Sequence, residues 1–164
     1  MKRRAFLCGV SASALLAGCS KFRTYNGPQV TRVLVYKGTR HMYLMHHDMV
    51  LERYDVGLGF APEGHKEVEG DGRTPEGNYW ITHRNPDSAF HLSLGISYPN
   101  EADRAHARTL GQSPGGDIFI HGDPDRMRRR RGMDWTAGCI AVTDREIEQI
   151  YAMVTPGTPI SIYP

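Results

Sequence analysis

The chain has 164 residues, of which 40% are hydrophobic and 23% are charged, a composition typical of one soluble globular domain. Its formal net charge of +2 comes from the first residues, because the chain after residue 18 holds 17 basic and 18 acidic side chains. This balance gives no electrostatic reason to expect nucleic acid as a partner. After residue 20, no apolar run has the length that a membrane-spanning helix needs.

Residues 1–18 are predicted to be an export signal. Lys2, Arg3 and Arg4 form a positively charged start, and an apolar stretch of small residues follows from 5 to 17. The Arg3-Arg4 pair fits a twin-arginine signal, and it also fits the general export route. We therefore expect an exported protein and exclude residues 1–18 from the fold.

The export signal ends in Leu16-Ala17-Gly18-Cys19, which resembles the lipobox of bacterial lipoproteins. In such proteins the cysteine is acylated and becomes the first residue of the mature chain. We expect lipidation at Cys19, a polar tether over residues 19–29, and a membrane-anchored location in the periplasm. The alternative is a chance cysteine near an ordinary cleavage site.

Residues 30–164 are predicted to form one mainly β domain, a β-rich α+β fold with two short helices. Short runs with Val, Leu, Ile and aromatic residues alternate with turns that contain Gly or Pro. The segment from 57 to 73 has no periodicity, which indicates a loop, and Thr74-Pro75-Glu76-Gly77 is a turn signal. The strands expected in this first part cover residues 31–36, 41–45, 49–56 and 78–83.

Two helices are predicted in the second part of the domain. The first covers residues 101–110 and follows the capping residue Asn100. The second covers residues 143–154 and begins with a capping box formed by Thr143 and Glu146. The remaining strands are expected at 117–121 and 158–163.

Cys139 is the residue with the most direct chemical meaning. Cys8 lies in the export signal and Cys19 in the lipobox, so Cys139 is the one thiol of the predicted domain. An unpaired cysteine in an exported protein is either a small buried apolar residue or a reactive thiol. His121 ends a predicted strand, and an imidazole can accept the proton of a thiol that attacks an acyl carbon. We predict that His121 keeps Cys139 ionised, and that the uncrowded backbone at Gly138 lets nearby N–H groups bind an oxyanion.

The residues around this pair resemble those of a known family. Ile120-His121-Gly122, followed by Asp-Trp-Thr-Ala-Gly-Cys-Ile at 134–140, is similar to the L,D-transpeptidase catalytic domain (YkuD type). That family pairs a His-Gly segment with a downstream [Ser/Thr]-x-Gly-Cys-[Ile/Val]. The Thr-Pro-x-Gly-x-Tyr segment at 74–79, residues 94–100 with Asp103, and the closing segment 157–160 also match. The resemblance extends over about residues 30–163.

The resemblance implies a YkuD-like β-sandwich in which the cysteine and the histidine face each other at the mouth of a groove. It implies a peptidoglycan tetrapeptide stem as substrate, with Cys139 attacking the carbonyl of the L-centre of meso-diaminopimelate and expelling the terminal D-alanine. The acyl-enzyme is then resolved by an amine or by water. The carbonyl of Gly122 would orient His121. The resemblance implies no metal and no cofactor, and it suggests that carbapenem-type β-lactams acylate Cys139.

Three other residues of the resemblance are candidates for oxyanion or substrate binding. Thr136 is expected to hydrogen-bond near the nucleophile, and Asp134 to pair with an arginine of the basic loop at 126–131 or to contact a substrate amine. The Tyr98 hydroxyl either helps to bind the oxyanion or packs in the core. Ala141 departs from the family pattern, because that position often holds Arg or Asn, and donor binding and the choice of acceptor are therefore left open.

Two further features have alternative interpretations. The basic run at Arg126 and 128–131 is either a solvated loop or a rim that attracts carboxylates or anionic head groups. Residues His41, His46 and His47 lack a carboxylate or cysteine at ligand spacing, so we expect no metal site there. Besides transpeptidation, two functions stay open: hydrolysis of the same bonds, including release of a wall-anchored protein, and non-catalytic binding of peptidoglycan by a lipoprotein.

Overall fold

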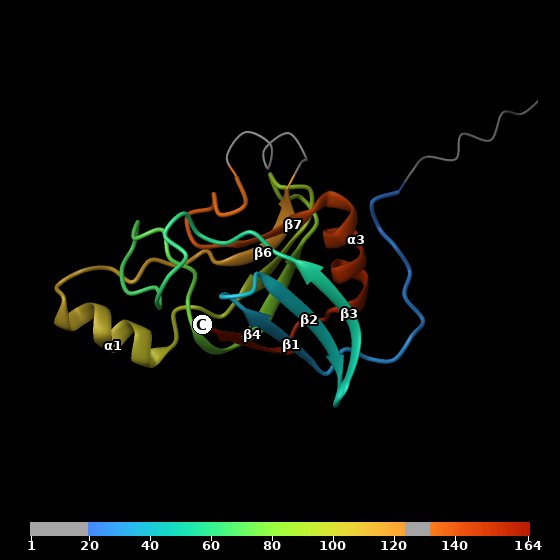
Figure 1. Cartoon of the computed structure of the whole chain (residues 1–164), viewed down its shortest axis with the longest axis horizontal. Coiled ribbons are helices and arrows are strands. Elements are labelled where there is room, and N and C mark those ends of the chain that lie inside the picture. Colours follow the sequence, from blue (N-terminus) through green and yellow to red (C-terminus); the bar gives the residue numbers. More distant parts are fainter. Residues whose placement is uncertain (1–19, 124–131) are drawn as a thin grey trace, which may run out of the picture.

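The computed structural model describes residues 20–123 and 132–164, and within them eight strands form one strongly curved sheet (Figure 1). The order of strands in the sheet is β3-β2-β1-β8-β4-β5-β6-β7. The β1–β8 and β6–β7 pairs are parallel and the other pairs are antiparallel. The elements are β1 (Arg32–Tyr36), β2 (His41–His46), β3 (Met49–Asp55), β4 (Gly77–Asn85), β5 (Ser93–Ile96), α1 (Glu101–Thr109), β6 (Phe119–Asp123), β7 (Ile140–Thr143), α3 (Asp144–Met153) and β8 (Pro159–Tyr163).

The two edges of the sheet nearly meet through the segment that follows β3. Gly57 pairs with Ala141 of β7, and each backbone N–H donates to the other's carbonyl at 2.8 Å. A Cβ atom at Gly57 would lie 2.2 Å from the carbonyl oxygen of Met133, so glycine is required for this close approach. Two residues after Gly57, Gly59 forms a second, parallel bridge to Thr136. The loop after β3 is thereby held against the segment that leads to Cys139.

The inner face of the curved sheet forms the core. Alternate residues of the longer strands point inward, as the period of two requires, and α3 closes the core against β5, β6 and β7. Each fully buried aliphatic side chain stabilises the fold by about 1.5–3 kcal/mol relative to an exposed one. The largest fully buried side chains are Met42, Leu44, Leu58, Tyr79, Ile81, Leu92, Leu94, Ile120, Ile140, Ile147, Ile150 and Ile160.

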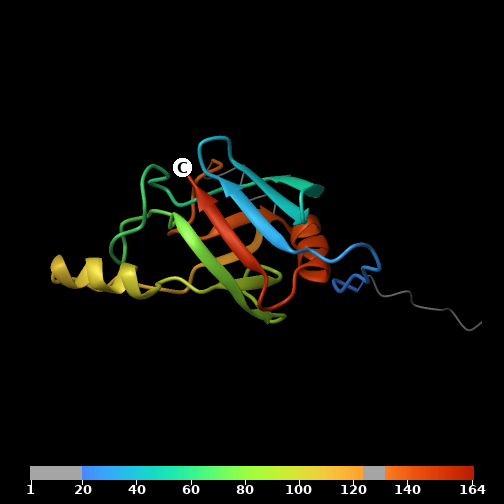
Figure 2. The ribbon, with the colours of Figure 1, turned by 90° about the horizontal axis from the view of Figure 1, so that it is seen from below.

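Both helices begin with a capping box, as the sequence predicts. The side chain of Asn100 accepts the N–H of Asp103, and the Asp103 side chain accepts the N–H of Asn100. Thr143 and Glu146 make the same reciprocal pair at α3. Each cap stabilises its helix by about 1 kcal/mol. Figures 1 and 2 both show α1 at one end of the molecule beyond the sheet, whereas α3 packs on the strands.

The structure confirms the predicted fold class, with eight strands and two short helices in the described residues. Two strands, β5 and β7, were not predicted. Both have only four residues, which are almost entirely buried and therefore show no alternation between polar and apolar positions. Across residues 20–123 and 132–164, none of the helices has the length and apolarity to cross a membrane. The predicted export signal, Cys19 and the basic run at Arg126 and 128–131 lie outside the described residues.

Candidate active site

His121 and Cys139 come together because β6 and β7 are neighbours in the sheet. The parallel register pairs Ile120 with Ile140 and His121 with Ala141, and Cys139 directly precedes β7. Both side chains line one pocket of about 250 Å³. The other residues that line this pocket are Asn85, Ser88, Phe90, Ser93, Asp117 and Phe119.

The imidazole of His121 has a defined orientation. Its Nδ1 lies 2.7 Å from the carbonyl oxygen of Gly122. Because a carbonyl oxygen can only accept, Nδ1 carries the proton and Nε2 is the basic nitrogen. The ring stacks on Phe90 with centroids 4.5 Å apart, and it makes a T-shaped contact with Trp135 at a centroid distance of 5.9 Å. His121 is 3% exposed, so these contacts leave the ring little freedom to reorient.

Burial lowers the pKa of His121, although the Gly122 carbonyl and the charge of Asp123 act in the opposite direction. The imidazole is therefore neutral at neutral pH, with the lone pair of Nε2 available to accept a proton. This is the protonation state that a general base needs before the reaction starts.

Gly122 is close to its neighbours on both sides. Its N–H donates to the carbonyl oxygens of Phe90 at 3.1 Å and Leu92 at 3.3 Å. A Cβ atom at this position would lie 2.5 Å from Oδ1 of Asp144 and 2.7 Å from the carbonyl oxygen of Phe90. Glycine therefore allows β6 to approach the 90–92 segment and place the carbonyl that orients His121.

The environment of Cys139 corrects the expectation that an imidazole keeps this thiol ionised. Burial raises the pKa of Cys139 and the nearby charge of Asp117 adds to the effect, while a backbone contact with Phe119 and the charge of Lys66 oppose it. The Sγ atom donates to the carbonyl oxygen of Asp117 at 3.4 Å, which requires a protonated thiol. In the resting protein the two groups are thus a neutral thiol and a neutral imidazole.

Thr136 organises the turn that carries Cys139. Its buried hydroxyl donates to the Cys139 carbonyl at 2.7 Å and accepts the N–H of Gly138 at 3.1 Å. Gly138 has φ +134°, and a Cβ atom there would lie 2.7 Å from the carbonyl oxygen of Arg73. The hydroxyl of Thr136 therefore accepts the Gly138 N–H, and the binding of an oxyanion by backbone N–H groups near Cys139 stays a prediction.

The structure does not bring Tyr98 or Asp134 into the pocket. The hydroxyl of Tyr98, which is 5% exposed, donates to the carbonyl oxygen of Pro114 at 3.0 Å, and burial raises the pKa of this phenol. Asp134 accepts from Nη2 of Arg40 at 2.8 Å and from the N–H of Leu58 at 3.0 Å. Tyr98 is thus a core residue, and Asp134 joins the β1–β2 turn to the loop that precedes Cys139.

The sequence offered no signal for several residues of the pocket wall. Asn85 is the last residue of β4 and lies beyond the predicted end of that strand, Ser88 and Phe90 belong to the connection that follows, and Ser93 lies in a strand that was not predicted. Asp117 was expected only as the start of a strand. For the histidines near β2, the described residues contain no group of three or more His, Cys, Asp or Glu side chains with the spacing of a metal site.

Comparisons with known proteins agree with this arrangement. Residues 30–162 match the family model of the YkuD L,D-transpeptidase catalytic domain. The Escherichia coli (strain K12) protein YafK, named as a candidate L,D-transpeptidase, is 32% identical over 124 residues, which are 70% of this chain and 44% of YafK. The chain thus spans less than half the length of this relative.

Solved structures share the fold. The helical cell shape determining protein Pgp2 from Campylobacter jejuni superposes with a TM-score of 0.61 and 24% identity, covering 84% of this chain and 49% of Pgp2. The L,D-transpeptidase LdtMt1, solved in complex with imipenem, superposes with a TM-score of 0.53 and 14% identity over 81% of this chain and 58% of LdtMt1. Because the family model covers most of the chain and includes both His121 and Cys139, the chain belongs to the L,D-transpeptidase catalytic domain family.

Proposed function

We propose that this protein is a cysteine-dependent L,D-transpeptidase that acts on peptidoglycan tetrapeptide stems through an acyl-enzyme on Cys139. The observation that carries the proposal is the shared pocket of His121 and Cys139, in which the Gly122 carbonyl holds the Nδ1 proton and leaves Nε2 as a base. Family membership supports the reaction class. Burial lowers the pKa of His121 and raises that of Cys139, which favours the uncharged forms of both, and we propose that the thiol proton moves during the attack.

The proposed reaction begins when Sγ of Cys139 attacks the carbonyl carbon on the L-centre of the diaminopimelate residue. Nε2 of His121 accepts the thiol proton as the carbon–sulfur bond forms. When the tetrahedral intermediate collapses, the bond to the terminal D-alanine breaks and the same proton passes to the leaving amine. His121 then accepts a proton from the acceptor amine or water as the acceptor bonds to the thioester carbonyl carbon. When this second intermediate collapses, the carbon–sulfur bond breaks and the proton passes from Nε2 to Sγ, which restores the Cys139 thiol.

The acceptor decides between transfer and hydrolysis. An amine from a second stem gives a cross-link, whereas water gives a shortened stem. Ala141 is 1% exposed and lies in the sheet between Gly57 and His121, so this position supplies no polar side chain to the donor peptide. Hydrolysis, including release of a protein linked to peptidoglycan, is therefore tested as the alternative outcome.

The experiment is incubation of the full chain with purified muropeptides, followed by mass spectrometry of the products. Cross-linked or amino-acid-exchanged products support transfer, and shortened stems alone support hydrolysis. Cys139→Ala and His121→Ala should each abolish product formation while the fold is retained. If both variants keep the activity or the cell phenotype of the parent chain, a non-catalytic peptidoglycan-binding role replaces the proposal.

We also propose that carbapenem-type β-lactams acylate Cys139. LdtMt1 has been solved with imipenem, and it shares this fold at 14% identity. Acylation should add the mass of one inhibitor to the parent chain and none to Cys139→Ala. A mass increase on Cys139→Ala would show reaction at another residue.

For location, we propose export to the periplasm and acylation at Cys19, on the basis of the sequence around residues 1–19. The mature protein should then begin at Cys19 and carry lipid, which mass spectrometry of the purified N-terminal peptide measures. Cys19→Ser should release the protein from the membrane fraction. Retention of Cys19→Ser in that fraction would contradict the lipid anchor.

A further inference from the structure

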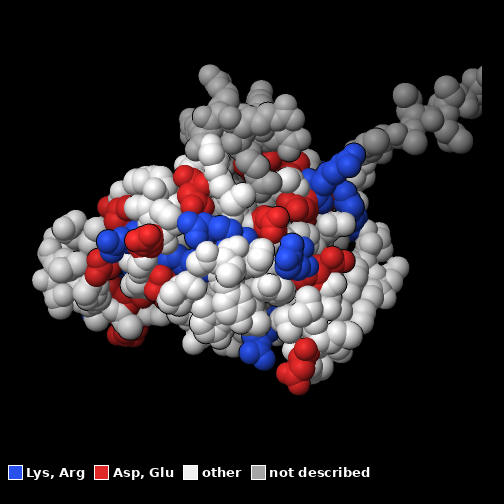
Figure 3. Space-filling model, viewed as in Figure 1, with Lys and Arg blue, Asp and Glu red and all other residues white. Residues whose placement is uncertain are grey.

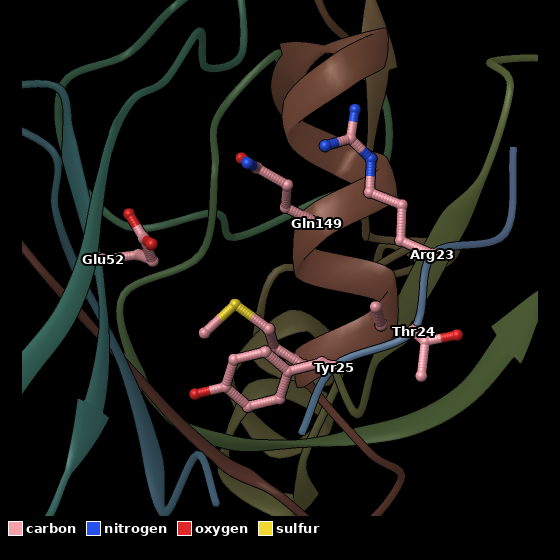
Figure 4. A pocket seen from close by; sticks show the side chains of 7 residues that line it. Arg23, Thr24, Tyr25, Glu52 and Gln149 are labelled. Atoms are coloured by element: carbon pink, nitrogen blue, oxygen red, sulfur yellow. The ribbon is translucent and has the colours of Figure 1, made fainter. Parts of the chain in front are cut away.

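The segment after the predicted lipid site contacts the domain instead of extending freely from it. Nζ of Lys21 donates to the carbonyl oxygens of Pro86 at 2.6 Å and His91 at 3.4 Å. Arg23 forms two hydrogen bonds with Oε2 of Glu148 on α3, at 2.8 and 3.0 Å. Figure 4 shows Arg23, Thr24 and Tyr25 running beside α3, and Figure 3 shows basic side chains gathered where the described N-terminal segment begins.

Glu148 connects this N-terminal segment to the wall of the active site. While Oε2 accepts from Arg23, Oε1 lies 2.9 Å from Nε2 of His91. The hydrogen bonds from His91 and Arg23 lower the pKa of Glu148, so the carboxylate stays charged at neutral pH. His91 is thus held on two sides, with Glu148 at its side chain and Lys21 at its carbonyl.

The backbone at His91 needs such support. The N–H of Leu92 donates to the carbonyl oxygen of Phe90 at 2.9 Å, which closes a three-residue turn centred on His91. His91 has φ +70°, and a γ-turn with a positive central φ is the rare, strained form. A strained residue of this kind costs on the order of 1–3 kcal/mol and persists only where its surroundings determine it.

The turn places a side chain directly on the catalytic base. Phe90, the first residue of the turn, stacks on the His121 ring and accepts the N–H of Gly122 through its carbonyl. A relaxation of the His91 turn would shift Phe90 and remove both contacts. The path from Lys21 and Arg23 to His121 therefore consists of consecutive contacts.

We propose that Lys21 and Arg23 are positioning residues for catalysis, which act through Glu148 and the His91 turn to hold Phe90 against His121. The inference rests on the proposed function for its kinetic consequence. An exposed ion pair contributes little to global stability. We therefore expect loss of the Lys21 and Arg23 contacts to change the orientation of the His121 imidazole rather than the free energy of unfolding. The segment that would join the domain to its lipid is thereby part of the support of the active site.

The test uses the full chain in detergent with the variants Lys21→Ala, Arg23→Ala and the double variant. The activity-independent readout is the NMR shift of the His121 ring protons, which a stacked Phe90 ring shields. The signal is assigned by its loss in His121→Ala. We expect it to move in the double variant, and kcat on a tetrapeptide muropeptide to fall about tenfold with KM unchanged, as a small misplacement of a catalytic group predicts.

Two further variants separate positioning from a general loss of charge. Arg23→Lys keeps a donor for Glu148 and should restore the NMR shift and most of kcat. Arg145→Ala removes an exposed arginine from α3, the helix that carries Glu148. Its NMR shift and kcat should match those of the parent chain. Melting temperatures should be similar throughout.

The proposal is overturned if the His121 signal in the double variant is identical to that of the parent, or if Arg145→Ala moves it equally. If the signal moves but no muropeptide is processed by the parent chain, the proposed function fails while the positioning role stands.

Discussion

The carbonyl oxygen of Gly122 accepts the Nδ1 proton of His121 at 2.7 Å, between two residues that are adjacent in sequence. This contact fixes the tautomer of a ring that burial keeps neutral. A backbone carbonyl supplies here the orienting function that a carboxylate supplies in many catalytic triads. It depends on β6 approaching the 90–92 segment, and thus on the absence of a side chain at Gly122.

Gly122→Ala should reduce both stability and activity. The new methyl group would meet Asp144 and Phe90 at less than van der Waals distance, and such overpacking costs about 1–3 kcal/mol. Movement of β6 to relieve it would displace the carbonyl that orients His121, so kcat falls. Urea denaturation measures the first effect and a muropeptide assay the second. Gly38→Ala is the control, because its Cβ would make only ordinary contact at 3.6 Å.

Alkylation of Cys139 by iodoacetamide should show the raised pKa of this thiol. Because the thiolate is the reactive form, the rate should rise with pH around a midpoint above that of free cysteine, about 8.5. At pH 7 the reaction should therefore be slower than that of a small free thiol. Mass spectrometry of the Cys139 peptide measures the rate. A midpoint below that of the free thiol would instead indicate a resting thiolate–imidazolium pair.

His121 should make the fold sensitive to mild acid. Its pKa in the folded state is lowered by burial, so the unfolded chain binds the proton more readily. The stability that the neutral imidazole contributes is complete above the usual histidine pKa of about 6.5. It is lost as the pH falls toward the lower pKa that His121 has in the folded state. His121→Gln should flatten this decline in the free energy of unfolding, measured by urea titration at several pH values. His47→Gln, at an exposed position, should leave the slope as it is.

Thr136→Val should destabilise the turn before Cys139. The substitution removes the acceptor of the Gly138 N–H and the donor to the Cys139 carbonyl, and unsatisfied buried groups cost about 1–3 kcal/mol. Because the same turn positions Cys139, the proposed nucleophile, kcat should also fall. Thr136→Ser retains the hydroxyl. It should keep most of the free energy of unfolding, measured by urea denaturation, and most of kcat, measured in the muropeptide assay. Equal losses in the two variants would show that the hydroxyl alone does not account for the role of Thr136.

Local patterns were sufficient for the predicted strands and both helices. The capping boxes at Asn100 and Thr143 are encoded by residues three positions apart, and the expected strands follow the period of the side chains. The family membership was equally visible, because the motifs around His121 and Cys139 are contiguous in sequence. Such features depend on interactions over a few residues.

The tertiary structure decided the protonation state of the site and its walls. Burial, which no local pattern reports, makes the thiol and the imidazole neutral. Phe90 covers His121 from a turn at His91, whose carbonyl and side chain contact Lys21 and Glu148, two residues that are distant in sequence. Sequence determined which groups are present for the chemistry, whereas long-range packing determined their charge and orientation, since both depend on the electrostatic and steric surroundings in the folded chain.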